Sequence, residues 1–363
     1  MEMRKKFDEI FEDCTKLGTK IKTDEYHSNG KHPIIDQGQE MVAGFTDLED
    51  GLLDAVPAIV FGDHTRIIKY VDCPFFLGAD GVKVLRSKVP NANYRYLYYA
   101  LKNAKIPNTG YNRHYKWLKE LEIEYPPIDQ QVKTVKVLDK VESIIYNRQN
   151  QLQKLDELVK ARFVEMFGDP VTNPMDWPTK PLLEMGYCKN GMNFHTGDSG
   201  IEMHCLGVGD FKDYSVIDGT DYLPTISLNE APPEESMLQD GDLVFVRSNG
   251  NKALVGRCLL VYPHNTPTTY SGFCIRYRLT SAEVNIAYLL RVLKTDSMRK
   301  KMAGRGANIQ NLNQQILAAL NIPTPPLELQ EWFTAFIEQI DKSKAVEGLL
   351  FVVVPIGIIY KPI

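Results

Sequence analysis

The stretch IDQQVKTVKVLDKVESIIYNRQNQLQKLDELVKARFVEM, residues 128–166, decides the fold of this chain. It contains no glycine or proline between Pro126–Pro127 and Gly168, so it predicts one uninterrupted helix. At about 1.5 Å per residue this helix is about 58 Å long, which is typical of a spacer rather than of a domain core. Its apolar residues follow the 3,4 spacing of a coiled-coil seam, with Arg148 and Arg162 at the two remaining seam positions. The apolar seam residues are Leu138, Val141, Ile145, Leu152, Leu155, Val159 and Met166. Such a seam requires a partner helix; the alternative is a solvated helix on the surface of one domain.

Length and composition indicate a soluble chain with more than one domain. The 363 residues, 44% of them hydrophobic, are enough for two domains with separate cores. Six scattered cysteines without a C-x-x-C pair, and a charged N-terminus without a signal-peptide core, predict a cytoplasmic protein. The apolar run 349–359 has 11 residues, against about 20 needed to cross a bilayer, so no membrane partner is expected.

Short apolar runs separated by turn motifs flank the long helix on both sides. They predict strands, and GDH (62–64) and GADG (78–81) mark turns between them. The predicted strands cover residues 32–36, 58–61, 66–71, 180–191, 206–211, 242–247, 255–262 and 273–279. With a helix predicted at residues 94–102, the fold class is α+β, with β-rich domains on either side of the helix.

The second half repeats the ending of the first half. Residues 284–294 resemble residues 92–102, and residues 306–330 resemble residues 110–131. A constant offset of 199 matches five pairs: Leu121 and Leu320, Ile123 and Ile322, Pro126 and Pro325, Pro127 and Pro326, and Gln131 and Gln330. These matches indicate an internal duplication. A second spacer helix should therefore begin after Pro326.

The second spacer helix starts with the right pattern and then loses it. Ile337 and Ile340 fall on the seam positions of Leu138 and Val141, but Lys344 falls on Ile145. The following Gly348, the run LLFVVV and Pro355 cannot continue a coiled coil. We therefore expect a truncated second helix over residues 325–344 and an atypical apolar tail over residues 345–363.

Motifs for chemistry are missing from the sequence. There is no phosphate-binding G-x-x-x-x-G-K-[ST] loop, no H-E-x-x-H, and no [DNS]-P-P-[YF] sequence of the kind that adenine methyltransferases use. The lone G-x-G in LGVGD (206–210) and the pair Asp63 and His64 are more typical of turns than of active sites. No catalytic residue, metal site or cofactor is predicted.

Basic residues gather at equivalent points of the two halves. Residues 102–119 contain five Lys or Arg and no acidic residue, and residues 291–305 contain six against one Asp. Interleaved aromatic and amide side chains, and RSNGNK (247–252) after a predicted strand, suit contacts to phosphates and base edges. The candidate DNA-binding residues are Arg66, Tyr111, Arg113, His114, Lys116, Arg247, Asn249, Asn251, Lys252, Arg305, Asn308 and Gln310. The alternative is that both segments are solvated helix faces.

Several motifs resemble the specificity subunit of bacterial type I restriction–modification systems. They are PIIDQGQ (33–39), IVFGDHTR (59–66), GYNRHYKWLKELEIEYPPIDQQ (110–131), GDLVFVRSNGN (241–251), SGFCIRYRL (271–279) and NIPTPPLELQ (321–330). The resemblance covers about residues 5 to 344 and implies two target-recognition domains in tandem, at residues 1–125 and 170–324. It also implies that a central helix (126–169) and a second helix hold these domains apart as an antiparallel coiled coil.

The resemblance also implies the partners. Each domain would read one half of a bipartite site in double-stranded DNA. The helices would dock methyltransferase subunits, two of them in the family, which bind S-adenosylmethionine themselves, and restriction or translocase subunits would join through the complex. The chain itself would be non-catalytic. The truncated second helix departs from the family, and keeps open the alternative of a truncated or silent subunit that acts only as a scaffold or half-subunit.

Overall fold

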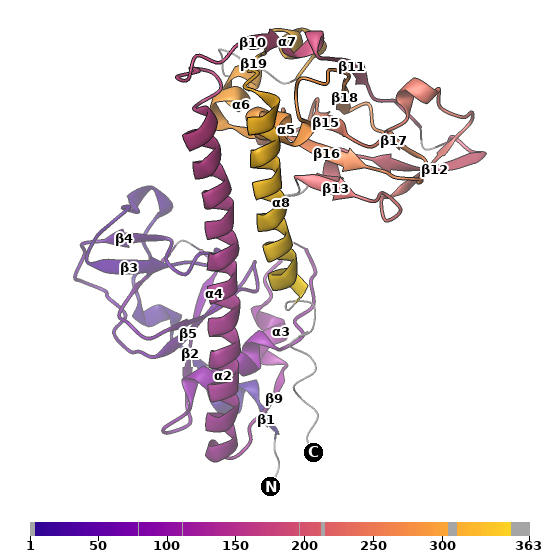
Figure 1. Cartoon of the computed structure of the whole chain (residues 1–363). Coiled ribbons are helices and arrows are strands. Elements are labelled where there is room, and N and C mark those ends of the chain that lie inside the picture. Colours follow the sequence, from indigo (N-terminus) through magenta and orange to yellow (C-terminus); the bar gives the residue numbers. More distant parts are fainter. Residues whose placement is uncertain are drawn as a thin grey trace. The chain divides into compact units, whose positions relative to one another are not determined.

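The chain forms two compact units in a computed structural model that describes residues 4–78, 80–110, 112–195, 197–211, 215–303 and 311–349 (Figure 1). The first unit is built on residues up to Asn150, and the second on Gln151–Leu350. None of the described helices combines the length and the apolar composition that crossing a bilayer requires.

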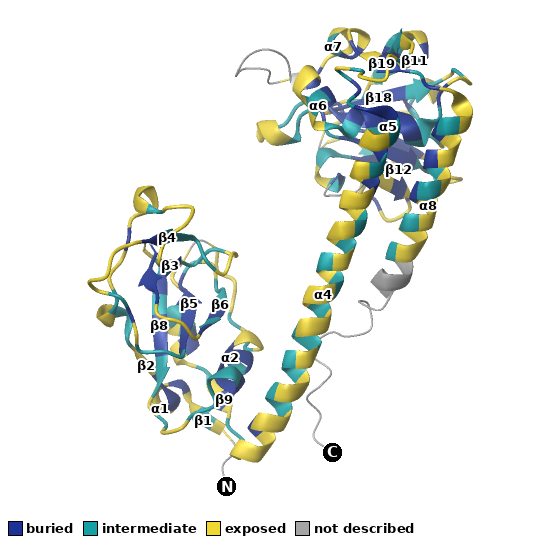
Figure 2. Ribbon diagram, turned by 60° about the vertical axis from the view of Figure 1, so that its left-hand side comes forward, coloured by how far each residue is buried: buried dark blue, intermediate teal, exposed yellow. Residues whose placement is uncertain are grey.

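The first unit contains two main sheets. One has the order β2 (Phe11–Asp13), β8 (Val82–Ser87), β5 (Ala58–Gly62), β6 (Ile68–Val71), with antiparallel neighbours. The other has the order β4 (Gly44–Thr46), β3 (His32–Ile35), β7 (Phe76–Leu77), and β3 and β7 are parallel. Strand β5 is buried throughout, because its apolar residues face packed layers on both sides (Figure 2). A small pair, β1 (Arg4–Lys6) with β9 (Glu122–Glu124), and helices α1 (Phe7–Ile10), α2 (Tyr94–Lys102) and α3 (Tyr115–Lys119) complete the unit.

The second unit repeats this topology. Its larger sheet has the order β11 (Gly186–Asn190), β18 (Cys274–Leu279), β15 (Asp242–Val246), β16 (Cys258–Tyr262), β13 (Val216–Asp218). Its smaller sheet has the order β14 (Thr225–Leu228), β12 (Ile201–Leu206), β17 (Thr268–Tyr270), again with one parallel pair, β12 with β17. The pair β10 (Thr179–Pro181) with β19 (Asn321–Pro323) and helices α5 (Ile286–Lys294), α6 (Asp296–Ala303) and α7 (Gln314–Ala318) follow the same plan, α6 being an addition.

Matching polar contacts confirm the duplication at atomic detail. In each unit an asparagine caps a helix, a tyrosine hydroxyl donates to a carbonyl at the small strand pair, and a glutamine amide donates to a proline carbonyl. The matched residues are Asn93 and Asn285, Tyr96 (to Glu124 O, 2.9 Å) and Tyr288 (to Pro323 O, 3.0 Å), and Gln131 (to Pro126 O, 2.8 Å) and Gln330 (to Pro325 O, 2.7 Å). The repeated sequence pattern thus reflects a repeated hydrogen-bond framework.

The long helix α4 (Ile128–Phe167) is continuous, as the sequence predicts. Within the second unit it runs antiparallel to α8 (Leu327–Leu349): Arg162 lies 4.7 Å from the Trp332 ring centre, and Lys344 donates to Asp156 at 2.5 Å. Helix α8 extends to residue 349, beyond the predicted end of the second helix at residue 344.

The predicted 3,4 seam lies along the less exposed face of α4, from half-buried Leu138 to buried Val159 and half-buried Met166. The seam did not include two of the three most buried residues near the end of α4, which are Val159, Phe163 and Phe167, spaced by four. The reason is that these three residues pack against α5 and α8 together, not against a single helix. A second helix that ends near Lys344 predicts that residues 152–166 of α4 lack cover. This prediction is wrong, because antiparallel pairing places the start of α8 beside this part of α4.

Two predicted strands also differ from the structure. The predicted strand 180–191 is divided into β10 and β11 by a 3-10 turn, Leu182–Glu184. Strand β12 ends at Leu206, and Val208–Asp210 forms a short 3-10 turn instead of continuing residues 206–211 as a strand. The Asp210 carboxylate accepts a hydrogen bond from the Gly207 amide at 2.8 Å and closes this turn.

Candidate nucleic-acid interface

Three glycine-containing turns of the first unit meet at Gln37, which follows β3. The Gln37 amide nitrogen donates to Asp80 O at 3.0 Å, and its amide oxygen accepts from the His64 amide at 3.2 Å. A Cβ atom on Gly62 or Gly81 would lie within 3 Å of Gln37 atoms, so both positions require glycine. Gln37 therefore organises the loop cluster, although sequence reasoning missed it; its place in PIIDQGQ was the available signal.

A buried pair connects this loop cluster to helix α3. The Asp63 carbonyl accepts from the His114 amide at 2.8 Å and lies 3.0 Å from its Nδ1, while the Asp63 carboxylate accepts from the Tyr115 amide at 2.7 Å. Asp63 is 4% exposed and His114 has no exposed surface. The GDH turn thus fixes the position of the segment that carries the basic residues.

The other candidates of the first half differ in their exposure. Arg113 and Lys116 are exposed, and the Lys116 ammonium lies 4.9 Å from the Trp117 ring centre. Arg66 has a left-handed backbone (φ 63°). Its guanidinium donates a hydrogen bond to Ile106 O at 3.3 Å, so one of its donors is already bound within the protein. Tyr111 lies outside the described residues.

The second unit builds an equivalent cluster at the end of β15. The Arg247 amide donates to Phe273 O at 2.8 Å, and its carbonyl accepts from the Leu312 amide at 2.7 Å. The same two connections in the first unit run from Asp63 to Gly81 and to His114. Three segments therefore converge in each unit. In the first unit they are the turns at Asp63 and Gly81 and the segment at His114 before α3, and in the second unit they are the turns at Arg247 and Phe273 and the segment at Leu312 before α7.

The loop after Arg247 is held by its own asparagines. The Asn249 amide oxygen accepts from the Asn251 amide at 2.8 Å, and that of Asn251 accepts from the Ala253 amide at 3.1 Å. Arg299 of α6 donates to Ala253 O at 3.1 Å from outside the loop. These contacts leave Asn251 and Lys252 exposed, whereas Asn249 is half-buried. Arg305, Asn308 and Gln310 lie outside the described residues.

Phe273 is a surface residue that the sequence did not single out. Its side chain is 61% exposed at the turn that receives the Arg247 amide. An exposed aromatic ring beside polar loop residues can stack on or wedge against a base.

Several cations of the two basic segments are paired or buried within their own unit. Lys102, although exposed, donates to Glu142 at 2.7 Å, and half-buried Lys294 donates to Ser215 at 2.6 Å. Burial lowers the pKa of Arg291, which is largely desolvated. The exposed cations of the described segments are Lys102, Lys105, Arg113, Lys116, Lys119, Lys300 and Lys301. A count of charges along the sequence therefore overstated the cations that a ligand could reach, because their internal partners are distant in sequence.

Among the described residues no group of three or more His, Cys, Asp or Glu side chains is placed to hold a metal ion. The loop clusters offer amide side chains, cations and an aromatic ring, which can bind a ligand by hydrogen bonds, charge and stacking.

The loop clusters belong to a fold seen in known proteins. A solved S subunit of a type I restriction–modification system from M. genitalium aligns over 96% of this chain and 93% of its own, with 16% identity and a TM-score of 0.52. A chain from a structure on complex assembly and conformational transition of the type I R-M system aligns over the same shares, with 15% identity and a TM-score of 0.52. At these identities the likeness shows the fold: two tandem domains with long helices.

Sequence comparisons agree with the fold. The specificity subunit of type I restriction enzyme StySPI from Salmonella potsdam is 28% identical over 157 residues, 42% of this chain and 33% of that protein. The EcoR124I/EcoR124II specificity subunit of Escherichia coli is 30% identical over 84 residues, 22% of this chain and 21% of that protein. The chain thus matches a third or less of the length of these relatives. The family described as type I restriction modification DNA specificity domain matches residues 3–157 and 230–348, and the chain belongs to this family.

Proposed function

We propose that the chain is the sequence-specific DNA-binding subunit of a type I restriction–modification complex. Each unit contacts one half of a bipartite duplex site through its loop cluster, and the helices dock methyltransferase subunits, two by the family's plan. Those subunits bring S-adenosylmethionine and the chemistry, restriction or translocase subunits join through them, and the chain itself catalyses nothing. The complex acts in the cytoplasm.

One observation carries this proposal: the same three-way junction of turns occurs at the same place in two duplicated domains. Asp63 follows β5 and Arg247 follows β15 at the same place in the two units. The backbone amide and carbonyl of each residue form hydrogen bonds with two other loops. Two copies of one reading surface suit a site with two specified blocks. Exposed Arg113 and Lys116 supply phosphate contacts in the first unit. In the second unit the loop after β15, with Arg247, Asn249, Asn251 and Lys252, contacts the bases beside Phe273 of the neighbouring turn.

His114 has a different role in this proposal from the one expected from sequence. Because its ring is fully buried against Asp63, it supports the loop cluster and does not contact DNA itself. Arg66, tied to the Ile106 carbonyl, is assigned to the edge of the same cluster.

The alternative of a scaffold that no longer reads two half-sites is not favoured. Both units contain a pair of sheets and the three-way junction of turns, and the shortened second helix is part of neither feature.

The proposal is tested by charge reversal in the first unit. Arg113→Glu with Lys116→Glu should lower affinity for target duplex and reduce the salt dependence of binding, because phosphate contacts dominate both. The measurement is a salt titration of DNA binding by the complex with its methyltransferase subunits, and exposed Lys16→Glu is the matched control. Unchanged affinity at about 0.1 M salt would argue against this placement.

The non-catalytic assignment has its own test. The purified chain, shown free of methyltransferase subunits, should transfer no labelled methyl group from S-adenosylmethionine to DNA. Labelling that follows the chain through purification would overturn the assignment.

A further inference from the structure

Lys69 of β6 is a buried cation that contacts the loop after β3. Its side chain is 4% exposed, and its ammonium donates to the Glu40 carbonyl at 2.5 Å and to the Asp36 carboxylate at 3.3 Å. Burial lowers the pKa of this ammonium, and the charge of Asp36 opposes the shift. Removing a lysine from water costs free energy, which an aliphatic side chain at this position of the sheet would avoid.

The second unit has an aliphatic side chain at the equivalent position. Lys69 pairs with the third residue from the end of β5, and Leu259 pairs with the third residue from the end of β15. Leu259 has no exposed surface. The carboxylate is missing there as well, because Asp36 follows β3 whereas Gly207 follows β12. The shared fold therefore does not require this buried ion pair, which belongs to the first unit alone.

The ion pair fixes the loop on both sides of Gln39. The Asp36 carboxylate accepts a hydrogen bond from the Gly38 amide at 2.8 Å, before Gln39. The Glu40 carbonyl, after Gln39, accepts the hydrogen bond from Lys69. Both neighbours of Gln39 are thus held from within the unit.

The side chain of Gln39 is exposed, and among the described residues its amide group forms no hydrogen bond. It lies two residues after Gln37, which joins the turns of the loop cluster through the Asp80 carbonyl and the His64 amide. A primary amide offers a donor and an acceptor that match N7 and N6 of adenine in the major groove. Because the backbone that presents this amide is already fixed, less conformational entropy is lost on binding.

We propose that Gln39 reads an adenine in the half-site of the first unit, and that Lys69 is the positioning residue that holds it in place. This proposal rests on the proposed DNA-binding function and adds one base contact and its support. In the second unit the corresponding segment forms the 3-10 turn Val208–Asp210, so the contact belongs to one block of the site only.

The test is selection from a random duplex library by the complex of the full chain with its methyltransferase subunits. Arg247→Ala marks the block of the second unit, so the other block belongs to the first. Gln39→Ala should lower the preference for adenine at one A·T pair of the first unit's block by at least about fivefold. The matched control is Asn29→Ala, an exposed amide residue before the start of β3, which should leave every base pair unchanged.

Lys69→Met separates positioning from folding, because Leu259 shows that an aliphatic side chain fits this place in the sheet. Lys69→Met should relax the same A·T pair as Gln39→Ala. The two changes together should relax that pair no further than Gln39→Ala alone, since they remove one contact. Thermal unfolding checks that the variants remain folded.

The outcomes distinguish this inference from the proposed function. Two enriched blocks for the unchanged protein, with no A·T pair that Gln39→Ala relaxes, would overturn the inference and leave the proposed function standing. If Lys69→Met lowered affinity equally for all sequences, the positioning role of Lys69 would be overturned. If the unchanged protein enriched no blocks, the proposed function and this inference would fall together.

Discussion

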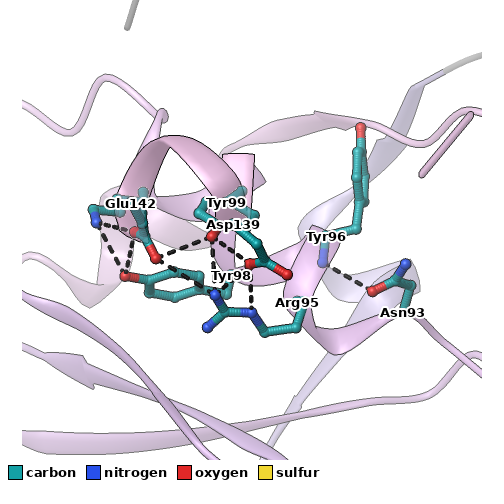
Figure 3. A network of polar contacts seen from close by, with 8 residues as sticks. Asn93, Arg95, Tyr96, Tyr98, Tyr99, Asp139 and Glu142 are labelled. Carbon is teal, nitrogen blue, oxygen red and sulfur yellow. Dashed lines mark hydrogen bonds and ion pairs between the residues drawn. The ribbon is translucent and has the colours of Figure 1, made fainter. Parts of the chain in front are cut away.

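The two halves of this molecule share a framework but complete it differently. In the second unit the space beside α5 is filled by the aromatic end of α4, so Tyr288 and Phe333 are fully buried. In the first unit the equivalent space beside α2 is a groove between α2, β9 and the first half of α4. The polar contacts between α2 and α4 (Figure 3) are a separate feature, because Asp139 and Glu142 match Glu338 and Asp341 of α8 at the offset of 199. Duplication therefore preserved the hydrogen-bond framework, while aromatic rings fill in the second unit a space that stays open in the first.

The largest expected effect tests the filled side of this comparison. Phe163→Ala removes a ring that is 4% exposed and packs on Phe167, Tyr288 and Phe333, at a cost of about 3 to 5 kcal/mol. The matched change Val141→Ala, in the open groove, should cost less than about 1 kcal/mol because little buried surface is lost. Hydrogen exchange of the α5 and α2 amides measures the two units separately. Equal losses would mean that the groove is not open.

A smaller effect concerns the ion network of the first unit. Burial alone would raise the pKa of Asp139 and of Glu142, but hydrogen bonds from Tyr99, Arg95 and Lys102 outweigh it and hold both pKa values below their usual 3.8 and 4.5. A lowered carboxylate pKa stabilises the folded state above the unfolded pKa, and this contribution disappears as pH falls through the folded value. The first unit should therefore lose stability below about pH 4.

The double variant Asp139→Asn with Glu142→Gln isolates this effect. It should remove the acid-dependent loss and lower stability at pH 7 by no more than about 1 kcal/mol, because both carboxylates are partly exposed. Urea unfolding at pH 3 to 7 provides the measurement, and the second unit's transition is the internal control. An unaltered pH profile would show that the network is not the source.

The smallest effect tests what the halves have in common. Asn93→Ala and Asn285→Ala each remove a side chain that accepts from helix amides, and should each cost about 1 kcal/mol in their own unit. Similar losses in hydrogen-exchange protection of α2 and α5 are expected. A clear loss in only one unit would mean that the matched caps are not equivalent in energy.

Sequence patterns predicted the features that local sequence determines, such as an uninterrupted helix and the repeat. The absence of glycine and proline predicted α4, and the offset of 199 predicted the paired glutamines Gln131 and Gln330. The end of α8 and the stripe of Phe163 and Phe167 were missed because they depend on which helices meet, which periodicity alone does not specify.

The candidate site was harder to predict than the fold. The motifs PIIDQGQ and IVFGDHTR contain turns that meet in the structure, but the contacts of this cluster join residues far apart in sequence. Gln37 lies 26 residues before Asp63 and 77 residues before His114. Which of the basic residues are paired within the protein also depends on distant partners, as with exposed Lys102 and Glu142. Exposure and hydrogen bonding, rather than residue type, therefore separate the loop supports from the candidate contacts.

Recognition of two DNA blocks by two duplicated units can be tested by selecting bound sequences from a random duplex library with the assembled complex. We expect two enriched blocks at a constant separation. With Arg247→Ala or Asn249→Ala, preference should relax in one block only, by roughly 1 to 3 kcal/mol at the affected base pair. A single contiguous block, or equal relaxation of both blocks, would show that the two units do not each read one half-site.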